Sequence, residues 1–403
     1  MLCAIAGSIA AVSPGASADP GSPADAGSFD YIPADVKARM IAQQPYSAAA
    51  KEIQLSIVSS GAATGFAGIG INAQGVDVWW KGAVPADVRS TIDKVRATVR
   101  VDVTPARFSR AELEAAAAPL AAGMKADGAS TLHSIQLPVD GSRVIAVLDS
   151  DAAVAKAKGR TTFRTSETPT GQTVGIRSDV PLEITKGDRL STAHRWNDGQ
   201  STGIFSGGAA ILNNDNGARC TTGFGVTNGS QEYILTAGHC GRTGGIMSNG
   251  NWSRQIGTAS NEHVAHDLLL IPSNVDHFIW DGGATTNMFV KSTTGWDWAR
   301  TGETVCFSGT TSGAQCGILN SSNFTYAYCD TDIYGNRECY NDLIYATRTG
   351  TVCQGGDSGA PVFTLNGASS VIAKGILSGC GTNHMAYQDF GTAWRDFNIR
   401  PVG

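Results

Sequence analysis

The first half of the sequence has a single cysteine, Cys3, and the second half has almost no lysine. After Cys3, no cysteine occurs before Cys220, and the remaining eight of the nine lie between Cys220 and Cys380. Two such different compositions within 403 residues favour two domains. We place the first over residues 30–190 and the second over residues 200–403, joined by a polar, glycine-containing segment that is typical of a processing linker.

The sequence also lacks a long apolar run and a strong charge of either sign. No stretch approaches the length of about twenty apolar residues that a membrane-spanning helix needs, so we expect no membrane segment. The net charge of −5 predicts no basic patch, which argues against a nucleic-acid partner. The 49 glycines follow no three-residue period, which excludes collagen and predicts many turns.

The N-terminus is typical of an export signal. Leu2 to Val12 are small and apolar, and Ala16-Ser17-Ala18 has the small-x-small pattern that signal peptidase cleaves. One feature departs from the pattern, because no Lys or Arg precedes the apolar run. We predict a signal peptide over residues 1–18 and a secreted, extracellular protein.

Eight clustered cysteines in an exported chain predict four disulfides rather than a metal site. No pair has the C-x-x-C spacing that structural zinc sites favour. The His263-x-x-His266 motif lacks the glutamate of a helical H-E-x-x-H site and precedes a strand-like run. We therefore expect no metal and no cofactor. Count alone leaves roughly a hundred possible pairings of eight cysteines, so the pairing stays open at this point.

The first domain is predicted as an α+β domain of alternating helices and strands. Ser109 and Glu112 have the spacing of a capping box and open an Ala-rich helix. Pro33 stands near the start of the other helix. The predicted helices cover residues 32–41 and 109–124, and the predicted strands cover 66–71, 76–80, 98–103 and 142–148.

The second domain is predicted to be all-β. Short runs rich in β-branched and aromatic residues alternate with clusters of Gly, Asn, Ser and Asp. Such a pattern over about 200 residues favours a sandwich or a pair of barrels. The predicted strands cover residues 223–227, 233–236, 267–271, 304–308, 360–364 and 371–377.

Three segments of the second domain supply the parts that activate a serine. Serine is a weak nucleophile until a base takes its proton and donors hold the resulting oxyanion. His239 directly follows a strand-like run and precedes a cysteine, and Asp267 stands at the entrance of an apolar run. Ser358 lies in a glycine-rich turn, where backbone N–H groups can converge because glycine has no Cβ.

These motifs resemble the chymotrypsin-like serine proteases, and especially the secreted bacterial branch of streptogrisins and α-lytic protease. The Thr-Ala-Gly-His-Cys pattern stands at residues 236–240, the Gly-Asp-Ser-Gly pattern stands at 356–359, and the order His, Asp, Ser also matches. The resemblance covers residues 203–402. It implies two antiparallel six-stranded β-barrels and a serine endopeptidase that acts on protein or peptide substrates.

The resemblance also assigns roles within the site. It implies that Ser358 is the nucleophile, that His239 is its base, and that Asp267 fixes the tautomer of the imidazole. The backbone N–H groups of Gly356 and Ser358 correspond to the oxyanion hole.

Substrate binding is assigned to Ser378 and Gly379, and Ser378 is also expected to buttress the catalytic carboxylate. Trypsin-like members place an aspartate about six residues before the nucleophile, where this chain has Thr351 and Val352. Leu377 stands where acid-preferring bacterial relatives carry a histidine. We therefore predict cleavage after apolar or medium-sized residues. His384 has no partner motif and is expected at the surface.

The disulfide pairing follows partly from the resemblance and partly from proximity in the sequence. The family braces the histidine loop and the nucleophile loop with one bridge each, and the four cysteines between them pair most simply with their neighbours. The expected pairs are Cys220–Cys240 and Cys353–Cys380 from the resemblance, and Cys306–Cys316 and Cys329–Cys339 from proximity.

The first domain resembles the pro regions of those bacterial proteases by its position in the chain. The implied role is to assist folding and then inhibit the protease until it is cut away. All-β double barrels have many non-local contacts and fold slowly, so a folding template would help. The alternative is an extracellular binding domain. We expect the protein to be a monomer.

Two other functions remain open for the second domain. One is a catalytically inactive homologue that only binds protein, and the other is a secreted esterase with the same three residues. An α/β-hydrolase is disfavoured, because Ala360 breaks the Gly-x-Ser-x-Gly elbow and the order of the three residues differs.

Overall fold

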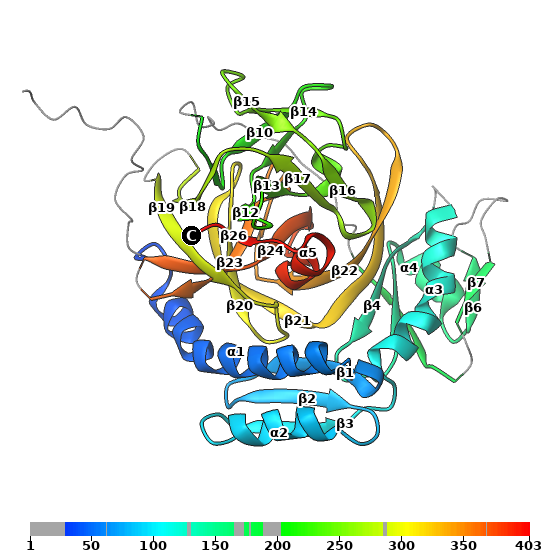
Figure 1. Cartoon of the computed structure of the whole chain (residues 1–403). Coiled ribbons are helices and arrows are strands. Elements are labelled where there is room, and N and C mark those ends of the chain that lie inside the picture. The colour runs from blue at the N-terminus through cyan, green and yellow to red at the C-terminus, as the bar shows by residue number, and fades with distance from the viewer. Residues whose placement is uncertain are drawn as a thin grey trace, which may run out of the picture.

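The computed structural model describes residues 29–61, 63–126, 130–164, 173–176, 179–187, 203–284, 288–367 and 369–403. The predicted signal peptide and most of the join between the two predicted domains lie outside the described residues. Among the described helices, none combines the length and the apolar character that a membrane span requires. Figure 1 shows the helix-rich N-terminal region beside the β-strands of the second half.

The N-terminal region begins with a three-stranded sheet and two helices around one small core. β1 and β2 are antiparallel, and β3 is parallel to β2. Ile53 and Ile57 of α1 are buried in that core together with Val78 and Ile92. The elements are α1 (Ala34–Ser60), β1 (Phe66–Ile71), β2 (Val76–Trp80), α2 (Ala86–Val95) and β3 (Val101–Pro105).

A second unit of the N-terminal region has its own core. β4 and β5 are antiparallel, and β8 is parallel to β5. Leu113 and Leu120 of α3 are buried on these strands together with Leu132 and Val144. The elements are α3 (Arg110–Ala126), β4 (Leu132–Pro138), β5 (Val144–Leu148), α4 (Asp151–Ala157), β6 (Thr162–Arg164), β7 (Thr173–Gly175) and β8 (Leu182–Lys186).

The prediction for this region was right in class and incomplete in detail. Strands 66–71 and 76–80 are confirmed, whereas the helix predicted over 32–41 runs for 27 residues and contains Pro45. It continues past Pro45 because Ile53 and Ile57 bury its apolar side, and tertiary packing stabilises most protein helices.

The last part of the chain closes into a six-stranded barrel. Each strand pairs with two others in the cycle β20, β21, β22, β25, β24, β23 and back to β20. The barrel has no free edge in this cycle, which confirms the predicted closed all-β architecture. The strands are β20 (Thr304–Gly309), β21 (Gly313–Thr331), β22 (Arg337–Thr347), β23 (Pro361–Asn366), β24 (Ser370–Cys380) and β25 (His384–Asp389).

The preceding strands form two sheets around a shared core. β11, β10, β14 and β15 make one sheet, and β16, β17, β13, β12 and β26 make the other. The strands are β10 (Ala210–Asn213), β11 (Arg219–Thr221), β12 (Gly225–Thr227), β13 (Glu232–Thr236), β14 (Ile246–Asn249), β15 (Gln255–Thr258), β16 (Asn261–His263), β17 (Leu268–Pro272) and β26 (Arg400–Pro401).

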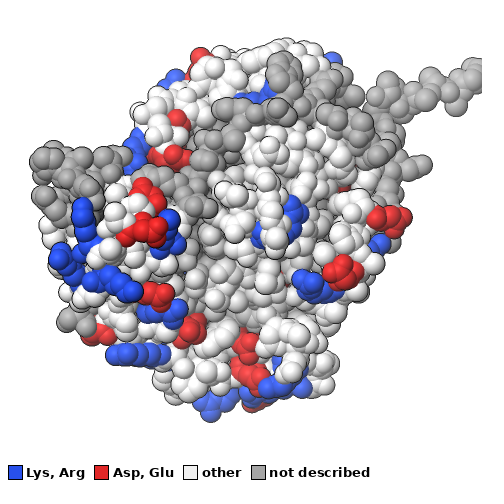
Figure 2. All heavy atoms as spheres, turned by 180° about the vertical axis from the view of Figure 1, so that it is seen from behind, with Lys and Arg blue, Asp and Glu red and all other residues white. Residues whose placement is uncertain are grey.

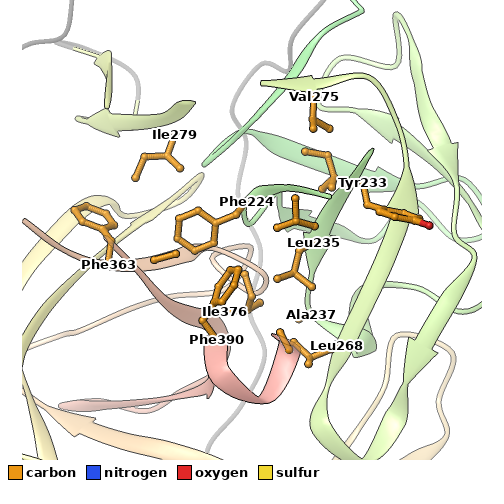
Figure 3. Packing of buried hydrophobic residues seen from close by; sticks show 14 of the residues in the cluster. Phe224, Tyr233, Leu235, Ala237, Leu268, Val275, Ile279, Phe363, Ile376 and Phe390 are labelled. Atoms are coloured by element: carbon orange, nitrogen blue, oxygen red, sulfur yellow. The ribbon is translucent and has the colours of Figure 1, made fainter. Parts of the chain in front are cut away.

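One hydrophobic core joins this first β unit to the barrel. Figure 3 shows Phe224 between Leu235 of the first unit and Phe363 and Ile376 of the barrel. Phe224 also meets Phe390 edge to face, with ring centroids 5.8 Å apart. The elements that link and cover the two units are β9 (Phe205–Gly207), β18 (Val275–Gly282), β19 (Met288–Trp296) and α5 (Phe390–Phe397).

The N-terminal region is attached to the barrel by strand pairing and by α1. β4 pairs antiparallel with β21, with Leu137 opposite Phe324 and Ser134 opposite Tyr328, so one sheet runs through both parts. Gln43 of α1 donates to the carbonyl of Gly302 at 2.7 Å.

Figure 2 shows acidic and basic side chains intermixed on the described surface of one face, without a continuous basic patch there.

Candidate active site

His239 and Asp267 meet in the interior of the first β unit. His239 lies in the short helix η2 (Gly238–Cys240) directly after β13, and Asp267 ends the short helix η3 (Val264–His266) in a left-handed conformation with φ of 52°. His239 Nδ1 lies 2.9 Å from both carboxylate oxygens, and the His239 backbone N–H donates to Oδ1 at 2.8 Å. A carboxylate only accepts, so Nδ1 carries the proton and Nε2 is left with its lone pair.

The surroundings favour the charged form of this histidine. Burial opposes protonation of His239, but the charge of Asp267 and the hydrogen bond to it outweigh burial and raise the His239 pKa. Asp330 and Glu338 add smaller contributions in the same direction. An imidazole with a raised pKa accepts a proton readily, as a general base must.

Ser378 holds the carboxylate from the other side. Its hydroxyl donates to Asp267 Oδ2, and it also lies 3.0 Å from the Tyr328 hydroxyl. Ser378 is positioned by β24, where the register shifts between Leu377 and Gly379. The structure thus brings Ser378 to Asp267, as the buttressing role requires, and it places Gly379 next to it on the same strand.

Ser358 lies in a turn that requires glycine at two of its positions. Gly356 and Gly359 have φ values of 95° and 86°, in the left-handed region. A Cβ on Gly359 would stand 2.1 Å from Thr236 Oγ1 and 2.3 Å from the Thr221 carbonyl oxygen. These constraints explain why the sequence places glycine on both sides of the nucleophile.

Asp357 fixes this turn to the start of β21. Its buried carboxylate accepts from the backbone N–H groups of Thr311 at 2.9 Å, Ser312 at 3.0 Å and Gln354 at 2.9 Å, and from the Ser312 hydroxyl at 2.6 Å. Burial raises the Asp357 pKa, and these hydrogen bonds act against that rise. Sequence analysis assigned no role to Asp357, although the residue is part of the motif that identified Ser358.

The backbone N–H groups of Gly356 and Ser358 are not used within the described part of the chain. The carbonyl groups of both residues are occupied, since Gly356 O accepts from Thr221 and Thr310 and Ser358 O accepts from the Thr221 N–H. This pattern fixes the peptide planes and leaves both donors available.

The cysteines pair as Cys220–Cys240, Cys306–Cys316, Cys329–Cys339 and Cys353–Cys380.

The hairpin of β21 and β22 covers the histidine. The rings of Tyr340 and His239 are 6.1 Å apart, and only 2% of His239 and 4% of Ser358 are exposed. His239 Nε2 is buried and has no hydrogen-bond partner among the described residues, so its bond to Ser358 is not formed. Sequence analysis missed Tyr328 and Tyr340. The available signal was that each directly flanks one cysteine of the Cys329–Cys339 pair.

Of the residues expected near the primary pocket, Val352 and Leu377 are apolar and buried, whereas Thr351 is exposed. Val352 and Leu377 belong to one buried cluster with Met385 and Tyr387. The expectation that His384 lies at the surface is wrong, because it is 3% exposed. Its ring stacks on the ring of Tyr345 of the neighbouring strand β22, with centroids 5.0 Å apart. Thr347 is the residue directly opposite His384 in that strand pair.

His263 and His266 come together with Asp396 of α5. The two imidazoles are stacked, with centroids 4.2 Å apart and planes 4° from parallel, and His266 Nδ1 bonds the Asp396 carboxylate. A metal is bound through lone pairs in the ring plane, and two stacked rings cannot both direct such pairs at one ion. The other close group, Cys220, His239 and Cys240, has its thiols joined in a disulfide.

The chain is similar to known proteins over part of its length. A family model described as Trypsin matches residues 209–397. The chain is 30% identical over 172 residues to Streptogrisin-C of Streptomyces griseus, covering 42% of this chain and 35% of that protein. It is 30% identical over 182 residues to Glutamyl endopeptidase 2 of Streptomyces griseus, covering 43% of this chain and 84% of that one.

Solved structures are similar over about half of the chain. The structure of Thermobifida fusca Protease A is 27% identical, with a TM-score of 0.38, and the match covers 49% of this chain and 97% of that one. The chain spans only 35% of Streptogrisin-C and 43% of Streptogrisin-D, two of the relatives it matches.

Replacing Asp357 by alanine should abolish most of the reactivity of Ser358. Three backbone N–H groups would lose their acceptor, and each buried unsatisfied donor costs about 1–3 kcal/mol, so the turn should rearrange. We expect Asp357→Ala to slow labelling of Ser358 by an organofluorophosphonate about a hundredfold or more. Asp276→Ala, which removes a partly buried aspartate bonded to Ser206, is the control. Unchanged labelling in Asp357→Ala would contradict the role of this residue.

The charge of Glu338 should influence the pH dependence of the same labelling. Burial, together with Asp332, Glu262 and Asp267, raises the Glu338 pKa to about 7. The ionised carboxylate in turn raises the His239 pKa. Ser358 reacts only when His239 is neutral, so Glu338→Gln should move the acid limb of the labelling rate to lower pH. Glu183→Gln, which removes an exposed glutamate that pairs with Arg143, is the control and should leave the acid limb in place. A shift to higher pH would show that the sign is wrong.

Proposed function

Because the chain belongs to the trypsin family of chymotrypsin-like serine proteases, we propose that it is a secreted endopeptidase made as a zymogen. The observation that carries this proposal is the geometry of His239. Its Nδ1 is held by Asp267, and its Nε2 is left as a lone-pair base in the half of the chain that also holds Ser358. Secretion is supported by the N-terminal sequence and by four disulfides.

The proposed reaction proceeds through an acyl-enzyme on Ser358. Ser358 Oγ attacks the carbonyl carbon while His239 Nε2 takes its proton, and the N–H groups of Gly356 and Ser358 hold the oxyanion. The same proton passes from His239 to the leaving amine as the peptide bond breaks. Water then hydrolyses the ester by the reverse sequence of proton transfers. Asp267 keeps its charge throughout and stabilises the imidazolium.

The proposed substrates carry an apolar or medium-sized residue before the scissile bond. Val352 and Leu377 are buried with other apolar side chains, and no charged group stands at either position. A relative is named Glutamyl endopeptidase 2. This chain has Leu377 directly before Ser378, where a cation or a histidine would be needed to bind a carboxylate at that point.

The N-terminal region is proposed to assist folding and to inhibit the protease. Support comes from the way β4 extends the barrel sheet at β21 and from the ion pair of Arg110 with Asp342 at 2.6 Å. A cavity of about 300 Å³ lies between α1 and the barrel, lined by Lys51, Glu303 and Lys374 among others. The contact is thus incompletely filled at α1, which suits a region that is later released.

A second candidate is an inactive homologue that binds protein. The observation in its favour is that His239 Nε2 is buried and has no partner among the described residues. If this function is correct, His239 stays covered permanently, and the covered form is not one state of a working active site.

Mass spectrometry after treatment with a fluorophosphonate tests the first proposal against the second. We expect a single adduct on Ser358 of the processed protein and none in His239→Ala, because serine needs the base to react. Hydrolysis of a peptide and an ester by the same sample then separates a peptidase from an esterase. If the processed, disulfide-bonded protein forms no adduct, the binding-protein function replaces the peptidase.

A peptide library tests the substrate preference. We expect the highest kcat/KM for Leu, Phe or Met before the cleaved bond, at least tenfold above Lys, Arg or Glu, because an unpaired charge is costly in an apolar pocket. Strict cleavage after Arg, Lys or Glu would refute the proposed preference.

Refolding tests the role of the N-terminal region. The fragment of residues 196–403 should recover active protein slowly and in low yield alone, and at least several-fold better when the N-terminal region is added in trans. The same region carrying Arg110→Ala, which removes the ion pair with Asp342, should help less. Equal yields with and without the N-terminal region would eliminate the folding role.

A further inference from the structure

The β21–β22 hairpin reaches from the barrel to the first β unit and ends there in a tight turn. β21 and β22 pair from Ala327 opposite Asn341 to Thr331 opposite Arg337, and the Cys329–Cys339 disulfide joins the two strands. Figure 1 shows this hairpin extending beside the strands of the first unit. We refer to residues 327–341 as the arm and to residues 332–336 as its tip.

The tip is internally rigid. Asp332 accepts from the backbone N–H groups of Tyr334 at 2.9 Å and Asn336 at 2.6 Å. Gly335, with φ of 85°, closes the turn through its N–H to the Asp332 carbonyl. These bonds present the Tyr334 ring and the Ile333 carbonyl outward from the turn as fixed contact groups.

Those two groups bind the first β unit. Asn213 Nδ2 donates to the Tyr334 hydroxyl at 2.8 Å, and the guanidinium of Arg242 lies 4.3 Å from the centre of the Tyr334 ring. Asn216 Nδ2 donates to the Ile333 carbonyl at 2.8 Å. The Tyr334 hydroxyl also donates to Asp215 Oδ2 at 3.3 Å. The contact therefore combines three hydrogen bonds with a cation–π interaction, all between segments more than 90 residues apart in the sequence.

This contact is connected to the base of the site. Asn213 is fully buried, and the same amide nitrogen that meets Tyr334 also donates to the carbonyl of Cys240, the residue after His239. Behind the tip, Tyr340 of the arm covers the His239 ring. His239 Nε2 is buried without a partner among the described residues. The bound arm thus coincides with a histidine that neither solvent nor Ser358 reaches.

The N-terminal region holds the base of the arm. β4 pairs with β21 from Asn323 to Tyr328, at the point where the arm begins. Arg337 Nη2 donates to the Met124 carbonyl at 3.3 Å, so the N-terminal region also contacts the arm directly beside its tip. Both strands of the arm are therefore attached on one side to the N-terminal region and on the other to the first β unit.

From these contacts we propose that the arm is an autoinhibitory latch, in which Tyr334 binds Asn213 and Arg242 to close Tyr340 over His239. The latch must open before a substrate reaches Ser358, and the N-terminal region keeps it shut by holding its base. This proposal rests on the proposed protease function for its consequence, but closure of the arm itself can be measured without activity.

Accessibility of His239 measures closure. Diethyl pyrocarbonate acylates a neutral imidazole nitrogen, and here only Nε2 is available, because Nδ1 is bonded to Asp267. The full chain is used in a Ser358→Ala background, so that it cannot cleave itself, and the rate at each histidine is read by peptide mass spectrometry. His277, which is partly exposed on β18 away from the tip, provides the internal reference.

The latch predicts a graded response at Tyr334. Tyr334→Ala should raise the rate at His239 relative to His277 about tenfold, because the competent population rises when the closed state is destabilised. Tyr334→Phe keeps the ring on Arg242 but loses the hydroxyl, and should give an intermediate rise. Trp252→Ala removes another exposed aromatic residue from the same β unit and should change nothing. An unchanged His239 rate in Tyr334→Ala overturns the latch.

The kcat/KM for a protein substrate, measured with Ser358 present, separates a latch from a wall of the binding site. A latch predicts a rise in Tyr334→Ala, whereas loss of a substrate-binding wall predicts a fall, and a fall overturns the proposal. If His239 becomes accessible in Tyr334→Ala but no variant cleaves any peptide, the latch stands and the proposed peptidase function fails.

Discussion

A buried carboxylate, Asp267, is the point on which the arrangement of the site depends. It accepts from the His239 backbone and ring and from Ser378, so one side chain joins the first β unit to β24 of the barrel. A carboxylate this deeply buried is tolerated only when its lone pairs are occupied. The hydrogen bonds that orient the histidine are therefore also the ones that make burial of Asp267 possible.

The turn of Ser358, the proposed nucleophile, is held by a second buried carboxylate. Asp357 takes three backbone N–H groups and one hydroxyl, all from the segments that flank the Ser358 turn. None of these donors is a cation, so backbone N–H groups and one hydroxyl hold this carboxylate. Thr221 of the first β unit holds the carbonyls of Gly356 and Ser358. None of these contacts involves the N-terminal region, so the proposed latency has to be explained elsewhere in the molecule.

The N-terminal region and the arm offer such an explanation together. The region adds β4 to the barrel sheet beside β21, and β21 continues into the arm that covers His239. Because a paired β-strand is stiff along its length, holding its base restrains its far end. A region proposed as a folding assistant would then also set the position of Tyr340 without touching the histidine.

Local sequence was sufficient for the parts that depend on short-range chemistry. Strands 66–71 and 76–80 were predicted in full, because their composition and the turns that flank them are local signals, although burial alternates only in the second strand. His239, Asp267 and Ser358 were identified as candidates because each stands in a short motif whose neighbours are dictated by the turn it makes. The all-β class of the second half followed from the spacing of its turns.

The sequence by itself determined the class of each half, and its motifs and spacings predicted the candidate site residues and the nearest-neighbour cysteine pairs. Only the tertiary structure decided that α1 continues past Pro45, that His384 is buried, and that Tyr340 covers His239. These features depend on which segments, far apart in the chain, pack against one another. Such packing is decided by the closure of the whole barrel and by the pairing of β4 with β21, and no local pattern contains that information.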